Sequence, residues 1–175
     1  GDYKIDDTPV IGKPYDLKTL GRIGDEGVLA LLCDSTNATV PGRTPSEMAV
    51  IPAFEEIFEQ TEGRLIVSTF SSSIHRLQIV FDVAHKYGRR VCVIGRSMIK
   101  NIEIAEEQGL LKIPHGTAID MSGSRALDDD EICYLVTGSQ GEMRAALWHM
   151  ATANFKGIEV EKGDLVDLPD IVSLV

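Results

Sequence analysis

The sequence is poor in the residues that build several common kinds of site. Only three of its 175 residues are cysteine, and none is spaced from another cysteine or from one of the four histidines as metal ligands are. Neither a disulfide scaffold nor a zinc site completed by this chain alone is therefore predicted. Cys33, Cys92 and Cys133 all lie in apolar runs, so we expect buried free thiols in a reducing compartment, the cytoplasm.

Long apolar runs, targeting signals and basic residues are scarce as well. No run approaches the length of a transmembrane helix and no secretory signal is present, so we expect no membrane partner. Lys and Arg number 17 against 27 Asp and Glu, which gives a net charge of −10. This charge excludes a protein that coats nucleic acid nonspecifically, although a local basic or amide-lined groove stays compatible with it. P-loop, dinucleotide and Ser-His-Asp patterns are absent too.

What the chain does have is alternating strand and helix patterns. Continuous apolar runs predict strands at 28–33, 65–70, 91–94 and 131–136, with shorter strands at 3–5, 158–160 and 165–166. Helical periodicity follows at 46–62, 74–88, 98–109 and from 141 onward, while 112–130 is expected to be irregular. Pro52 should kink or restart the first helix. The order predicts an α/β fold with a mostly parallel, doubly wound, Rossmann-like sheet and helices on both faces; antiparallel α+β pairing fits such strands poorly.

Four small polar turns follow the strands and should meet at one edge of the sheet. They are Asp34-Ser35-Thr36-Asn37, Ser71-Ser72-Ser73, Gly95-Arg96-Ser97 and Thr137-Gly138-Ser139-Gln140-Gly141. Ligands of open α/β sheets bind at this edge, where helix N-termini present unpaired N–H groups. With Arg76 and Arg96 alongside, the turns predict an anion or nucleotide site. The alternative is that strand-to-helix turns are polar merely because they cap helices.

Asp34 and His75 are the titratable groups of interest near these turns. Asp34 ends a predicted buried strand, where it could cap the turn, ligate a metal or act as a general base. His75 directly follows the serine turn and could face the same edge. His85 and His149 lie on predicted helices and are expected at the surface.

Five segments, taken in order, resemble one known family over about residues 1–166. They are Asp2-Tyr3-Lys4-Ile5-Asp6, Leu31-Leu32-Cys33-Asp34-Ser35-Thr36-Asn37-Ala38, Thr69-Phe70-Ser71-Ser72-Ser73-Ile74-His75-Arg76, Gly95-Arg96-Ser97-Met98 and Thr137-Gly138-Ser139-Gln140-Gly141-Glu142. The chain resembles the ribonuclease J proteins of bacteria and archaea, members of the metallo-β-lactamase superfamily that carry a β-CASP domain.

The resemblance implies a two-zinc ribonuclease with 5′ to 3′ exonuclease and endonuclease activity, in which the β-CASP domain clamps single-stranded RNA over the metals. Residues 1–43 would be a piece of the metallo-β-lactamase domain and 44–175 the β-CASP domain. Asp34 would bridge the two zinc ions. The resemblance implies RNA binding by Ser71, Ser72, Ser73, His75, Arg76, Gly95, Arg96, Ser97, Thr137, Gly138, Ser139, Gln140 and Glu142.

The sequence also departs from that family. The H-x-H-x-D-H zinc motif and the C-terminal histidine motifs are missing, Met143-Arg144 replaces the usual Pro-Met, and 167–175 does not follow the usual path. We therefore expect a fragment that binds no zinc and hydrolyses no RNA alone. Its partners would be RNA and the metallo-β-lactamase domain of the parent chain, with a homo-oligomer allowed through the parent. The alternative functions are a noncatalytic α/β module that binds a nucleotide or a protein, and a scaffold with ordinary polar turns.

Overall fold

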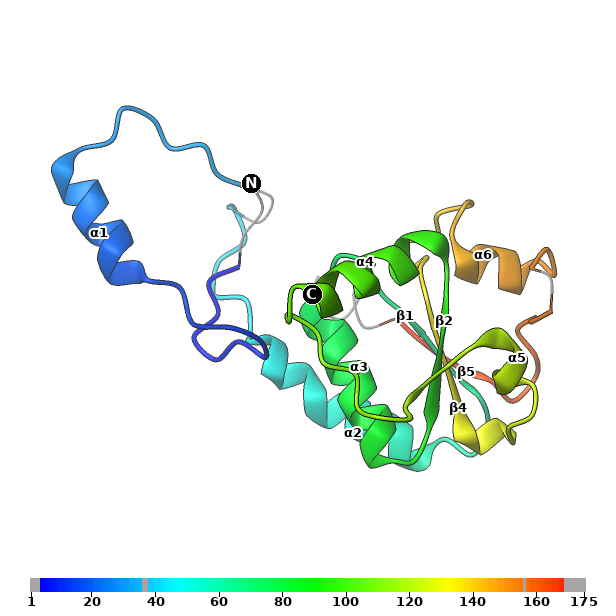
Figure 1. The fold of residues 1–175 in the computed structure, drawn as a ribbon. Helices are drawn as coiled ribbons and strands as arrows, with labels where there is room; N and C mark the ends of the chain where they lie inside the picture. Colours follow the sequence, from blue (N-terminus) through cyan, green and yellow to red (C-terminus); the bar gives the residue numbers. More distant parts are fainter. Residues whose placement is uncertain (1–3, 36–37, 156, 169–175) are drawn as a thin grey trace. The chain divides into compact units, whose positions relative to one another are not determined.

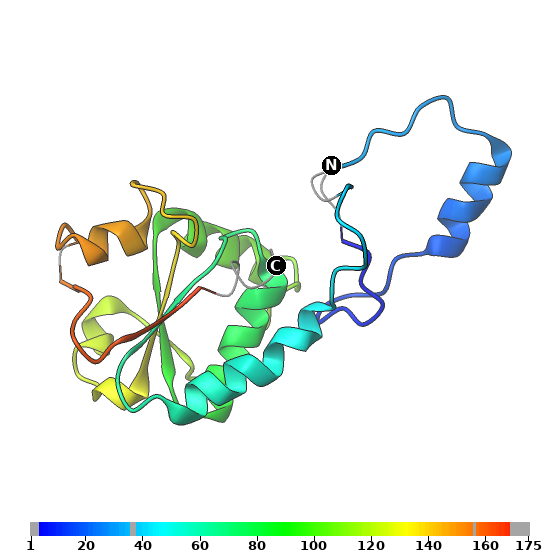
Figure 2. The same cartoon turned by 180° about the vertical axis from the view of Figure 1, so that it is seen from behind.

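The chain divides into two units, which are described separately. The structure is a computed structural model that describes residues 4–35, 38–155 and 157–168 (Figures 1 and 2). The first unit is Gly1–Ala49 and the second is Val50–Val175. None of the helices in the described ranges combines the length and hydropathy needed to span a bilayer.

The second unit is built on a five-stranded sheet in which every pairing is parallel. Its strands are β1 (Leu65–Ser68), β2 (Arg90–Ile94), β3 (Ala118–Ile119), β4 (Ile132–Val136) and β5 (Leu165–Asp167). Their order across the sheet is β3-β2-β4-β1-β5 (Figure 1). The predicted parallel α/β sheet is thus confirmed.

Helices lie on both faces of the sheet, as predicted. The chain moves from β1 to β2 to β3 in one direction, and from β3 to β4 to β5 in the other. Because such crossovers are right-handed, α3 (Ile74–Lys86) and α4 (Arg96–Glu107) cover one face, and α5 (Met121–Ser124) and α6 (Ala146–Ala151) cover the opposite face (Figures 1 and 2). α2 (Ile51–Gln60) packs beside α3.

The core explains why the strands read as continuous apolar runs. All four residues of β1 and all five of β4 are buried, since helices cover them on both sides. The face toward α5 and α6 is filled by Ile66, Cys92, Ile94, Ile132, Tyr134, Val136, Ala146, Met150 and Ile158. In the helices predicted at 74–88 and 98–109, the residues that face the core include Leu77, Phe81 and Ala84 of α3 and Met98, Ile102 and Ala105 of α4.

Pro52 restarts the helix that precedes β1, as predicted. A 3-10 turn, η1 (Glu47–Val50), comes first, and α2 begins at Ile51 with Pro52 in its first two positions, where a missing N–H costs nothing. Phe54 and Phe58 face the core. α2 ends at Gln60, two residues before the predicted end at 62.

The predicted strand at 28–33 is wrong. These residues form neither helix nor strand, and Leu29, Leu31 and Leu32 are almost fully exposed. A strand needs a neighbour to receive its backbone hydrogen bonds, and no described strand pairs with this run. Cys33 is consequently exposed, whereas Cys92 and Cys133 are buried free thiols as expected.

Three smaller differences concern local structure. The predicted strand at 158–160 is absent, because the backbone N–H of Val160 bonds to the carbonyl of Met150 at the end of α6 instead of to a strand. The region 112–130 is more ordered than expected, since it contains β3, α5 and part of the turn η2 (Asp129–Glu131). Lys4 and Ile5 form no strand, and Tyr3 lies outside the described residues.

The first unit contains α1 (Leu17–Glu26) and a cluster of hydrogen bonds around Asp6. α1 was not predicted; Asp16 caps it by accepting a hydrogen bond of 2.9 Å from the Thr19 N–H. The Asp6 carboxylate accepts bonds from the Glu47 N–H (2.9 Å) and the Ser46 hydroxyl (3.0 Å). Desolvation acts to raise the pKa of Asp6, but these hydrogen bonds outweigh it, so the pKa lies below its ordinary value.

Candidate functional site

Three of the four predicted turns meet at the carboxyl edge of the sheet. β2, β4 and β1 are neighbours, and their last residues are in register: Ile94 with Val136, and Ser68 with Val136. The turns that follow these strands, 69–73, 95–97 and 137–142, therefore start at the same level. The sequence could place each turn at a strand end, but only the strand order shows that these three are adjacent.

The glycine turn after β2 touches the turn after β4. A Cβ added to Gly95 would lie 3.5 Å from Oγ1 of Thr137, and Gly95 has a φ of +117°. The Thr137 carbonyl accepts a hydrogen bond of 3.0 Å from the Leu147 N–H, which ties the turn to α6. The chain leaves β2 for one face of the sheet and β4 for the other, so these turns flank the point where ligands bind in open α/β sheets.

The serine turn is held against α4. Ser73 is the N-cap residue of α3. Nδ2 of Asn101 donates to the Ser71 carbonyl (2.9 Å) and to the Ser71 hydroxyl (3.1 Å). The Thr69 N–H donates to the Val136 carbonyl at 3.1 Å, so the ends of β1 and β4 are joined. Sequence reasoning missed Asn101, because an asparagine inside a helix gives no signal of its partner.

The predicted site residues differ in accessibility. Ser72, Arg96, Ser97, Gln140 and Glu142 are exposed, and Ser71, Ser73, His75, Gly95 and Thr137 are half-buried. Arg76, Gly138 and Ser139 are buried, with 4% of Arg76 and 3% of Ser139 exposed. The exposed cation among the predicted residues at this edge is thus Arg96, and Arg76 lies inside the fold.

The turn after β4 differs from its prediction. No helix starts behind Gly141, because α6 begins only at Ala146 and the intervening residues form further turns. Gly138 and Gly141 have φ values of +123° and +75°, which a helix does not accept. Met143, within the helix predicted from 141 onward, is 71% exposed. α3 and α4 start directly behind their turns, whereas α6 reaches this edge only at Ala146 and Leu147, whose N–H groups bond to Thr137.

An apolar hollow adjoins the Gly95 turn. Its volume is about 550 Å³, and it is lined by Val93, Ile94, Gly95, Ile99, Ala118, Ile119, Asp120, Met121 and Phe155. Its one carboxylate, Asp120, is used to cap α5, since it accepts a hydrogen bond of 2.7 Å from the Gly123 N–H. The polar turns therefore have an apolar neighbour of considerable size.

Asp34 belongs to the first unit, where it is half-buried. Thr36 and Asn37 of its turn lie outside the described residues. No group of three or more His, Cys, Asp and Glu side chains within the described ranges could hold a metal ion. Because zinc needs three or four protein ligands, the described residues do not fit a complete zinc site, and Asp34 would be a single donor.

Comparisons with known proteins agree on one family. A family model for the ribonuclease J β-CASP domain matches residues 62–171. The ribonuclease J of Synechocystis sp. is 45% identical over 166 residues, which are 95% of this chain and 26% of that protein. That of Helicobacter pylori is 46% identical, covering 95% of this chain and 24% of the relative. That of Corynebacterium glutamicum is 45% identical over 168 residues, covering 96% and 23%. The chain thus spans about a quarter of these relatives.

Proposed function

The chain belongs to the ribonuclease J family through its β-CASP domain, and we propose that it holds single-stranded RNA along the carboxyl edge of its sheet within a longer RNA-hydrolysing protein. The observation that carries the proposal is the meeting of three polar turns at one edge, with Gly95 against Thr137 and Asn101 bonded to Ser71. Turns that only cap helices would also lie at this edge, so RNA binding itself has to distinguish the two alternatives.

The chemistry of this edge suits a phosphodiester chain. Hydroxyl groups at 71–73, 97 and 137 offer donors to phosphate oxygens, and glycines let a backbone approach closely. Arg96 supplies an exposed positive charge at the first turn of α4. His75, in the first turn of α3, is half-buried. These groups would contact the RNA backbone without reading its sequence.

The apolar hollow beside Gly95 offers room for a base. RNA-binding proteins hold unpaired bases against apolar and aromatic side chains while basic groups follow the phosphates. Phe155 and Ile99 line this hollow, next to the turn that would contact phosphate. A base that leaves the RNA backbone at Gly95 would enter it.

RNA cleavage is proposed for the longer parent protein that contains this chain. There, two zinc ions would activate water and polarise the scissile phosphate, for both exonuclease and endonuclease cleavage. Asp34 is proposed as one ligand, and the remaining ligands would come from the metallo-β-lactamase domain. The free buried thiols Cys92 and Cys133 support a reducing, cytoplasmic location.

A binding titration tests the part of the proposal that concerns this chain. We would follow the fluorescence anisotropy of a labelled, 5′-phosphorylated RNA of ten nucleotides, with wild type, Arg96→Gln and Lys162→Gln. Lys162 is an exposed cation in the turn before β5 and serves as the charge-matched control. Arg96→Gln should weaken binding several-fold and lower the salt slope by about 1.

Two results would contradict the proposal. One is no saturable RNA binding by the wild type at low salt. The other is equal weakening by Arg96→Gln and Lys162→Gln, which would show a nonspecific charge effect. Tight binding of a mononucleotide with no preference for RNA would instead favour a noncatalytic nucleotide-binding module.

A further inference from the structure

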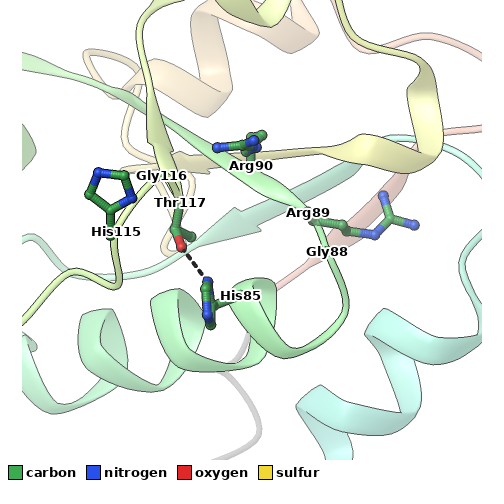
Figure 3. A pocket seen from close by; sticks show the side chains of 7 residues that line it. All are labelled: His85, Gly88, Arg89, Arg90, His115, Gly116 and Thr117. Carbon is green, nitrogen blue, oxygen red and sulfur yellow. Dashed lines mark hydrogen bonds between the residues drawn. The ribbon is translucent and has the colours of Figure 1, made fainter.

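A second hollow, which is polar, lies at the opposite edge of the sheet, where β2 and β3 begin. Figure 3 shows it from close by: His85 comes from the end of α3, Arg90 from the start of β2, and His115, Gly116 and Thr117 from the segment before β3. Its volume is about 200 Å³. The five residues of β2 separate it from the Gly95 turn by roughly 13 Å, so it is not part of the RNA edge proposed above.

The side chains around this hollow carry donors and positive charge but no carboxylate. None of its lining residues is acidic, although the chain as a whole has a net charge of −10. Arg90 pairs with Ile132 only through the sheet, and among the described residues the side chains of Arg90 and His115 have no hydrogen-bond or ion-pair partner. Nδ1 of His85 lies 3.0 Å from Oγ1 of Thr117, so the imidazole is held in place beside them (Figure 3). An arginine and two histidines at one hollow are typical of anion recognition.

Arg89, the residue before Arg90, fixes the backbone beside the hollow through several hydrogen bonds. Arg89 is 3% exposed, and its guanidinium turns away from the hollow (Figure 3) to donate to the backbone carbonyls of Thr61, Gly63 (2.9 Å), Asp129 and Ile132 (3.1 Å). Burial lowers the pKa of Arg89. These bonds fix the turn that carries Arg90, so the Arg90 side chain starts from a rigid backbone.

Gly116 also lines this hollow and lies close to the Arg90 guanidinium. Its φ is +74°, and a Cβ placed on it would lie 3.0 Å from an Nη atom of Arg90. A side chain at position 116 would therefore be strained by its φ and would require the Arg90 guanidinium to shift slightly. Gly116 and Arg90 both line the hollow.

We infer that this hollow binds a single phosphate group, either free or carried by a nucleotide or RNA. The charge and the donor set fit an oxyanion, and the volume is below the 300 Å³ or more of typical sites for larger ligands. Arg90 would pair with two phosphate oxygens, and His85 and His115 would donate to the others. The site is independent of Arg96 and of the turns at the carboxyl edge.

Backbone amide NMR on the ¹⁵N-labelled chain tests this inference, with inorganic phosphate as the probe and chloride at equal ionic strength as the reference. Phosphate should shift the amide signals of Arg90, Gly116 and Thr117 saturably. Arg90→Gln should raise the dissociation constant at least fivefold, and His115→Gln should also raise it. Lys162→Gln, the charge-matched control, and Arg96→Gln, at the RNA edge, should leave it unchanged. Retained amide dispersion reports that each variant is folded.

The outcomes separate this inference from the proposed function. Nonsaturable shifts scattered over the surface, or an Arg90→Gln variant that titrates like wild type, would overturn the phosphate site whatever the RNA result. If 5′-phosphorylated RNA moves the same three amides at much lower concentration than inorganic phosphate, the bound phosphate is that of RNA. If inorganic phosphate alone moves them, the ligand is a free phosphate.

Discussion

The Arg64 guanidinium donates two parallel hydrogen bonds of 2.7 Å to the carboxylate of Asp164, one hundred residues away in the chain. Side-chain exposure is 13% for Arg64 and 4% for Asp164. The hydrogen bond to Asp164 is the main cause that raises the pKa of Arg64. Arg64 also donates to the Glu159 carbonyl, and its own carbonyl accepts from Leu165, the first residue of β5. The pair therefore fastens the segment before β5 to the start of β1.

Replacing Arg64 by Gln should lower the free energy of unfolding by about 3 kcal/mol, because Asp164 would be left charged and nearly buried. Urea denaturation measures the change. Lys86→Gln is the control, since Lys86 pairs with Glu55 at the surface through a single contact of 2.6 Å, and exposed pairs contribute little. Equal losses in the two variants would show that the Arg64 pair is no stronger than a surface pair.

Gly138→Ala should destabilise the protein and weaken RNA binding together. A Cβ on Gly138 would lie 2.9 Å from the Cβ of Ala145 and 3.0 Å from that of Leu147, and its φ is +123°. We expect a loss of about 2–3 kcal/mol from strain and crowding. Gly109→Ala isolates the strain, because Gly109 has a φ of +68° and open space around it. Denaturation curves that coincide for the two variants would contradict the packing argument.

Asn101→Ala should weaken RNA binding more than it changes stability. The variant removes both hydrogen bonds to Ser71, while alanine favours the helix and offsets part of their loss. Asn101 would thus act as a positioning residue for the serine turn. Ile104→Ala, on the same helix and uncharged, controls for changes in α4. The anisotropy titration described above gives the readout. Unchanged affinity in Asn101→Ala would show that the turn needs no support from α4.

The three thiols should react at very different rates. Cys33 is exposed, whereas Cys92 and Cys133 are buried. Burial raises the pKa of Cys92, and it raises that of Cys133 to about 12. At pH 8 a disulfide reagent such as dithiobisnitrobenzoate should therefore modify one thiol quickly, and all three only after unfolding. Cys33→Ser should abolish the fast phase. A fast phase of two or three thiols in the native chain would contradict the burial.

The same shift predicts a loss of stability in alkali. The folded pKa of Cys133 lies above the ordinary value of 9.0, so folding favours the neutral thiol. Its contribution is complete below pH 9 and is lost as the pH rises from 9 to about 12. Cys133→Ala should flatten this part of the stability curve relative to wild type, which urea midpoints at each pH would show.

Ser68→Ala should leave the protein as stable as wild type or make it more stable. The Ser68 hydroxyl is buried at the end of β1 and has no hydrogen-bond partner among the described residues. Removing an unsatisfied polar group recovers up to about 1 kcal/mol. A lower melting temperature for Ser68→Ala than for wild type would be contrary to this expectation.

The sheet was predictable where local pattern and tertiary environment agree. The runs at 65–68 and 132–136 are apolar at nearly every position because helices cover both faces, and this is what the pattern predicted. The run at 28–33 has a similar composition, but none of the described strands pairs with it and its leucines are exposed. Composition alone cannot distinguish the two cases, because strand formation depends on a neighbour elsewhere in the chain.

The candidate site was predictable in part for a similar reason. Each turn could be read from the sequence, because small and hydroxyl residues follow each apolar run. Their adjacency depends on the strand order, which places β4 between β1 and β2. The partners of Ser71 and of Arg64 come from 30 and 100 residues away, and His85 meets Thr117 from 32 residues away. Contacts of this range leave no local pattern in the sequence. The role of Asp34 and the domain boundary at 43 and 44 remain predictions.

The position of β4 has a consequence for how the chain folds. β1 and β2 do not pair with each other, since both pair with β4. During synthesis β1 leaves the ribosome without a partner and β2 can pair only with the two-residue β3, so both wait for residues 132–136, an interval on the order of seconds at ordinary translation rates. Sheet formation in this unit must therefore be late and dominated by nonlocal pairing, which slows folding. A chain stopped before residue 132 would carry two hydrophobic strands with open edges, and it should aggregate or recruit chaperones.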